Sequence, residues 1–118
     1  MNKAEIYIES LDEIFNGDKL LIYKACNSFL KHVDYYLNLM KCAYEEDNRI
    51  EIQRITHSFK TTLHMFGDKR AIQIAKELED EITYNKNMQY KYIFTDFIEA
   101  IKSAQNTSKY IIDTMKIK

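Results

Sequence analysis

The stretch that decides the fold class is residues 18–45, DKLLIYKACNSFLKHVDYYLNLMKCAYE. Its apolar residues recur at intervals of three and four, which is the period of one face of an α-helix. They are Ile22, Ala25, Phe29, Val33, Tyr36, Leu37, Met40 and Tyr44. A continuous apolar stripe of about six turns predicts one long amphipathic helix over this stretch.

Two glycine–aspartate pairs show where helices end and begin. Gly17-Asp18 and Gly67-Asp68 contain both glycines of the chain. Glycine closes a helix in the left-handed conformation, and aspartate caps the helix that follows. Together with short polar connections at 46–48 and 85–89, these pairs predict five helices, at about residues 3–15, 18–45, 49–66, 68–84 and 90–116.

The rest of the composition agrees with a helical domain. The chain has 118 residues, of which 46% are apolar, and no proline. This length supplies one hydrophobic core, and no segment shows the alternation of a strand. Because short connections place consecutive helices antiparallel, we expect one all-α domain over residues 1–118. Its predicted architecture is an antiparallel up-and-down four-helix bundle with a short additional N-terminal helix.

Charge and hydropathy narrow the possible functions. The chain carries 17 basic and 18 acidic side chains, so no basic excess favours nucleic-acid binding. No apolar run is long enough for a secretory signal or a membrane span, so we expect a cytoplasmic protein that does not bind membranes. Cys26 and Cys42 fall about 24 Å apart along one predicted helix and cannot pair. We expect Cys26 to be buried and Cys42 to be an exposed thiol.

The helix predicted over residues 49–66 carries the candidate chemistry. Its apolar face contains Ile52, Ile55, Phe59, Leu63 and Phe66. The opposite face contains Arg54, His57, Thr61 and His64, and Lys60 follows His57 by one turn. A neutral imidazole has a ring nitrogen that can attack phosphorus. Because phosphoryl transfer needs mainly positioning and charge neutralisation, His57 is a candidate phosphoacceptor and Lys60 a candidate stabiliser of the phosphoryl charge.

Three motifs resemble the signature of histidine-containing phosphotransfer (HPt) domains. They are residues 56–60 (THSFK), Phe66-Gly67 ten residues further on, and Leu78-Glu79 in the next helix. The family pattern is histidine, any residue, leucine, lysine and glycine, then an apolar–glycine pair and a leucine–glutamate pair. Phe15-Asn16-Gly17-Asp18 and Glu46-Asp47 also resemble the family, so the resemblance covers nearly the whole chain.

The resemblance implies a phosphorelay intermediate. His57 would accept a phosphoryl group from the aspartyl phosphate of a receiver domain and pass it to another receiver aspartate, with Lys60 stabilising its charge. Arg54, Thr61 and His64 would form the receiver docking face, and Gly67 would have a structural role. The partners would be response-regulator receiver domains and a hybrid sensor kinase.

The same resemblance, together with the sequence, implies no enzymatic activity. The family has no kinase activity of its own, and this sequence has no glycine-rich phosphate loop. We expect no cofactor, and no metal, because His57 and His64 are about 10 Å apart along the helix. We also expect a monomer.

Two departures from the family pattern leave two alternatives open. Thr61 stands where the family has glycine, and His64 replaces a small residue. Both narrow access to His57, so the first alternative is a receiver-binding module that is not phosphorylated. Residues 57–63 (HSFKTTL) also resemble the H-box of sensor histidine kinases, without its acidic residue and proline. The second alternative is therefore a kinase-type dimerisation and phosphoacceptor domain, which Phe66-Gly67 fits less well.

Overall fold

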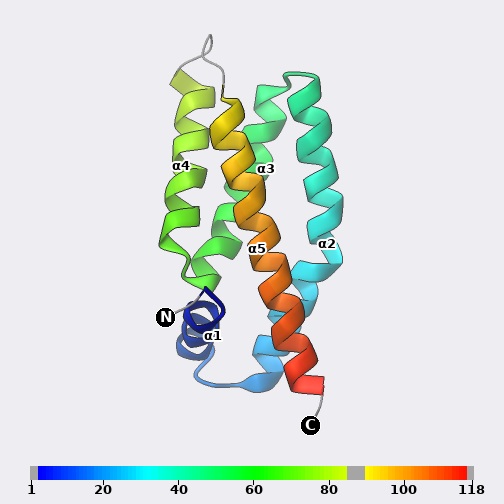
Figure 1. Ribbon diagram of the computed structural model, residues 1–118, viewed down its shortest axis with the longest axis vertical. Helices are drawn as coiled ribbons and strands as arrows, with labels where there is room; N and C mark the ends of the chain where they lie inside the picture. The colour runs from blue at the N-terminus through cyan, green and yellow to red at the C-terminus, as the bar shows by residue number, and fades with distance from the viewer. Residues whose placement is uncertain (1–2, 85–89, 117–118) are drawn as a thin grey trace.

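The computed structural model describes residues 3–84 and 90–116, and all of its regular structure is helical (Figure 1). The helices are α1 (Lys3–Ile14), α2 (Lys19–Glu45), α3 (Arg49–Phe66), α4 (Lys69–Tyr84) and α5 (Lys91–Lys116). No strand occurs within the two described ranges. The predicted all-helical class is confirmed, and each helix bound agrees with the prediction to within one residue. The predicted connection at 85–89 lies outside the described residues.

The glycine–aspartate pairs end and begin helices as predicted. Gly17 and Gly67 adopt the left-handed conformation, with φ of 70° and 69°. The Asp18 side chain accepts hydrogen bonds from two backbone N–H groups of the first turn of α2, and Asp68 accepts one in the first turn of α4. Because each aspartate caps its helix rather than joining it, α2 and α4 begin one residue later than predicted.

The helices pack around one core. The long helices α2 to α5 lie along the 51 Å dimension of the molecule, with α2 against α3 and α5, and α4 against α3 and α5 (Figure 1). The buried side chains form one cluster that draws on all five helices. Cys26 is buried and Cys42 is exposed, both as free thiols, as predicted. None of the described helices combines the length and hydropathy needed to cross a membrane.

Helix α1 packs across the turn between α3 and α4. The Tyr7 ring contacts the Phe66 ring, with centroids 5.1 Å apart, and the Tyr7 hydroxyl donates to Asp68 Oδ2 at 2.5 Å. One turn further along α1, Ser10 Oγ donates to the carbonyl oxygen of Met65 at 2.9 Å. These contacts hold α1 against the C-terminal end of α3. Because they involve residues before and after Gly67, they restrain both sides of the α3–α4 turn.

The Tyr7–Asp68 hydrogen bond predicts a loss of stability in alkali. Burial, and secondarily the bond to Asp68, raise the pKa of Tyr7 well above its ordinary value of 10.0. Since the unfolded chain ionises this phenol near pH 10 and the folded chain does not, the stability it provides is complete below about pH 10 and declines at higher pH. Tyr7→Phe should lower the free energy of unfolding at pH 7 by about 1–3 kcal/mol, because Oδ2 of the buried Asp68 carboxylate loses its donor. It should also flatten the alkaline decline.

Denaturant unfolding between pH 7 and pH 11 measures both effects. Tyr92→Phe is the matched control, because the Tyr92 side chain is 84% exposed. If the free energy of unfolding of Tyr7→Phe falls with pH as steeply as that of the wild type, groups other than Tyr7 cause the alkaline decline.

Candidate functional site

Helix α3 presents the two faces that the sequence predicts. Its predicted apolar residues Ile52, Ile55, Phe59, Leu63 and Phe66 are all buried. Arg54, His57, Thr61 and His64 are exposed, and Lys60 is half-buried at the edge. Thr56 is fully buried, which the sequence analysis did not predict. The buried face fixes the rotation of α3, so it also fixes the direction in which His57 points.

His57 lies beside a lysine and a carboxylate. Its side chain is 75% exposed, and its Nδ1 atom lies 3.7 Å from Glu79 Oε1 of α4. The same carboxylate oxygen lies 3.4 Å from Lys60 Nζ. We call these three residues the His57–Lys60–Glu79 cluster. In the sequence, Glu79 stands out only as part of the Leu78-Glu79 motif, which does not indicate its contact with His57.

Glu79 is placed to orient the imidazole. Its Oε1 atom is buried and accepts no hydrogen bond from the residues that the structure describes, so attraction to Lys60 and His57 is what stabilises it. A carboxylate beside Nδ1 favours a proton on that nitrogen. The other ring nitrogen, Nε2, is then left with a free lone pair. The cluster therefore favours the tautomer of His57 that is protonated on Nδ1.

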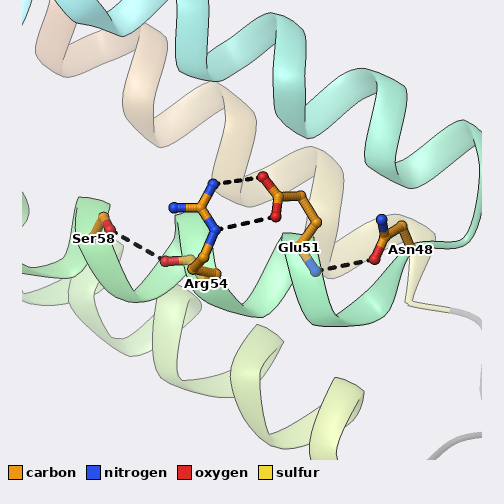
Figure 2. Close-up of polar contacts among 4 residues, drawn as sticks. All are labelled: Asn48, Glu51, Arg54 and Ser58. Carbon is orange, nitrogen blue, oxygen red and sulfur yellow. Dashed lines mark hydrogen bonds and ion pairs between the residues drawn. The ribbon is translucent and has the colours of Figure 1, made fainter.

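Arg54 is paired on its own helix. Its guanidinium makes two hydrogen bonds to the Glu51 carboxylate, one of them from Nε at 3.1 Å, and these lower the pKa of Glu51 (Figure 2). Asn48 Oδ1 accepts from the Glu51 backbone at 3.2 Å, and Ser58 Oγ donates to the Arg54 carbonyl at 3.2 Å (Figure 2). Arg54 is thus one half of an ion pair rather than an unpaired cation.

Thr61 and His64 share the exposed face of α3 with His57. Both side chains are exposed, and the imidazole of His57 keeps 75% of its surface open in their presence. The branched side chain of Thr61 and the ring of His64 therefore do not cover the candidate phosphoacceptor. Gly67 closes α3 through a hydrogen bond from its N–H to the His64 carbonyl at 3.1 Å.

A cavity of about 370 Å³ lies between α2 and α3, and Ser58, the residue after His57, is part of its lining. Its lining includes His32 and Tyr36 from α2, and Ser58, Phe59 and Thr62 from α3. No pattern within one helix predicts this cavity, because it depends on how two helices meet. The charged side chains of Lys60 and Glu79 therefore lie on the α4 side of α3, and the largely apolar cavity lies on its α2 side.

In the described part of the chain, no group of three or more His, Cys, Asp or Glu side chains is placed to hold a metal ion. Comparison of the chain with protein-family models, with curated proteins and with solved structures found no match. The geometry of the His57–Lys60–Glu79 cluster and the sequence motifs are therefore the features that bear on function.

Proposed function

We propose that this chain is a phosphorelay intermediate of the HPt kind. His57 accepts a phosphoryl group from the aspartyl phosphate of one receiver domain and passes it to an aspartate of another. The observation that carries the proposal is an imidazole that is 75% exposed on a helix with a buried opposite face, next to Lys60 and Glu79. The partners are response-regulator receiver domains and a hybrid sensor kinase, and the chain has no kinase activity of its own.

The proposed scaffold is one domain over residues 1–118. Helices α2 to α5 form an antiparallel up-and-down bundle, and α1 is a short additional helix at its amino end. Support comes from the contacts of α2 with α3 and α5, and of α4 with α3 and α5. The core residues of all these helices belong to a single chain. This favours the phosphotransfer function over a kinase-type domain, in which two chains together build the core.

The proposed transfer step is a displacement at phosphorus. The Nε2 lone pair of His57 forms the N–P bond while the bond from phosphorus to the aspartate oxygen breaks, and the aspartate leaves as a carboxylate. The product ring keeps its proton on Nδ1 and carries a positive charge. Glu79, at 3.7 Å from that nitrogen, stabilises this charge. No proton has to leave the site, and the second receiver's aspartate reverses the step.

Lys60 stabilises the phosphoryl group in this proposal. Its Nζ atom is 3.4 Å from Glu79 Oε1, and the side chain is 26% exposed. A lysine has three donors on a flexible stem, so it can keep Glu79 as one partner and donate to a phosphoryl oxygen as well. Arg54, Thr61 and His64 form the docking face, together with the cavity between α2 and α3.

Glu79→Gln should slow phosphate uptake by about tenfold or more, because a neutral amide no longer favours the proton on Nδ1. The ¹⁵N chemical shifts of the His57 ring report the tautomer, and rapid-quench sampling gives the rate. Asp80→Asn is the matched control, since it removes the next, exposed carboxylate of α4. An unchanged tautomer and an unchanged rate in Glu79→Gln would exclude the positioning role.

The direct test is incubation of the wild-type chain with phosphorylated receivers encoded by the same genome. Acid-labile phosphate on the chain, mapped to His57 by mass spectrometry, supports the proposal. Binding of a receiver without uptake, followed by uptake in Thr61→Gly, would identify the receiver-binding module instead. If no receiver binds the chain and none transfers phosphate to it, both functions are contradicted.

A further inference from the structure

Helix α1, the start of α2 and the end of α5 meet at the end of the molecule away from the 46–48 connection (Figure 1). The exposed large apolar residues of these segments are Ile6, Ile8, Ile14, Leu20, Leu21 and Tyr110. Leu20 is 62% exposed and Tyr110 56%. An exposed apolar patch of this kind commonly marks an interaction surface.

The same segments enclose a groove of about 550 Å³. Ile8 from α1, Leu20 and Tyr23 from α2, and Tyr110 and Ile111 from α5 are among its lining residues. No lining residue belongs to α3 or α4, so the groove is separate from the His57–Lys60–Glu79 cluster. A partner bound in the groove leaves His57 accessible.

Two unpaired charges of opposite sign flank the groove. Asp12 of α1 and Lys19 of α2 both line it and are exposed, and within the described residues neither forms an ion pair. In a two-fold symmetric contact, residue i of one copy meets residue j of the other, and the reverse also holds. Asp12 and Lys19 can therefore pair twice across such a contact, so the rim is complementary to itself.

An anionic membrane fits this surface less well. Residues 3–24 and 109–116, which supply the segments around the groove, contain six acidic side chains and five lysines, so no basic excess attracts anionic headgroups. Repulsion between copies is small, because the net charge of the chain is −1. The charges thus favour a second copy of the same chain.

We propose that two copies of this chain form a two-fold symmetric dimer through this groove. Leu20 and Tyr110 of one copy fill the groove of the other, and Asp12 of each copy pairs with Lys19 of its partner. The proposal is independent of the phosphorelay function, and the monomer expected from the sequence is the alternative outcome of its test.

Charge reversal tests the pairing. Lys19→Glu and Asp12→Lys should each weaken self-association at least about tenfold, because each places like charges opposite one another twice. An equimolar mixture of the two variants should form a heterodimer, because every cross-interface pair is then again of opposite sign. Both changes also suit their helices, since an acid is favoured at the start of α2 and a base near the end of α1. The folded monomer should therefore be preserved, which circular dichroism checks.

Sedimentation equilibrium of the wild type, each variant and the mixture gives the association constants. Lys31→Glu reverses an exposed lysine of α2 outside the groove and should leave the wild-type dimer unchanged. A wild type that stays monomeric up to about 1 mM, the range of very weak association, would overturn the proposal. So would a dimer that persists in both single variants, or a mixture that does not associate. None of these measurements uses phosphate, so a failure of the dimer proposal can be distinguished from a failure of the transfer assay.

Discussion

Replacing His57 with glutamine should abolish uptake of acid-labile phosphate from a phosphorylated receiver. Glutamine has no ring nitrogen that can attack phosphorus, and the other members of the cluster are not substitutes, because Glu79 is partly buried and Lys60 is paired with it. The His57 side chain is 75% exposed and does not belong to the core cluster, so the free energy of unfolding should change by no more than about 0.5 kcal/mol. The loss of label should therefore not reflect unfolding.

Two other histidines provide matched controls. His64 lies two turns further along the exposed face of α3, and His32 is exposed on α2 beside the cavity. His64→Gln and His32→Gln should both keep the label, although either can alter its rate through docking. Radiolabelled transfer followed by acid treatment measures all three variants side by side. Label that persists in His57→Gln and disappears in His64→Gln would identify His64 as the phosphoacceptor in place of His57.

The helices and their faces could be predicted because their signals are local. A stripe of period 3.6 fixes which side of a helix is buried, and the Gly-Asp pairs fix where helices end. The exposure of His57 and the burial of Cys26 follow from position within such a stripe. These features need no knowledge of how one helix meets another.

The surroundings of His57 could not be predicted in the same way. The 3.7 Å distance between His57 Nδ1 and Glu79 Oε1 depends on the axial position and the rotation of α4 relative to α3. No pattern within one helix specifies these. The packing of Tyr7 on the α3–α4 turn joins residues 61 positions apart. Thr56 is buried although it is polar, because its position around the helix axis falls within the apolar face of α3. The pairing of Arg54 with Glu51 is different, since i,i+3 spacing could have indicated it.

Gly67→Ala should cause a large loss of stability. A Cβ atom at this position would lie 2.7 Å from Ser10 Oγ and 2.8 Å from Ser10 Cβ, so α1 would have to move. The residue also has a φ of 69°, which costs a non-glycine residue about 1–2 kcal/mol. With overpacking added at about 1–3 kcal/mol, we expect a total decrease of about 2–5 kcal/mol in the free energy of unfolding. Denaturant titration measures it.

Gly17→Ala separates the two causes. Gly17 has nearly the same φ, 70°, but nothing within 4 Å of the position of a Cβ atom, so it should lose only the conformational part, about 1–2 kcal/mol. In a Ser10→Gly background the contact is absent, and the cost of Gly67→Ala should fall toward that of Gly17→Ala. Equal losses at the two glycines would mean that α1 does not press on the α3–α4 turn. The difference between them therefore measures how firmly α1 holds the end of the helix that carries His57.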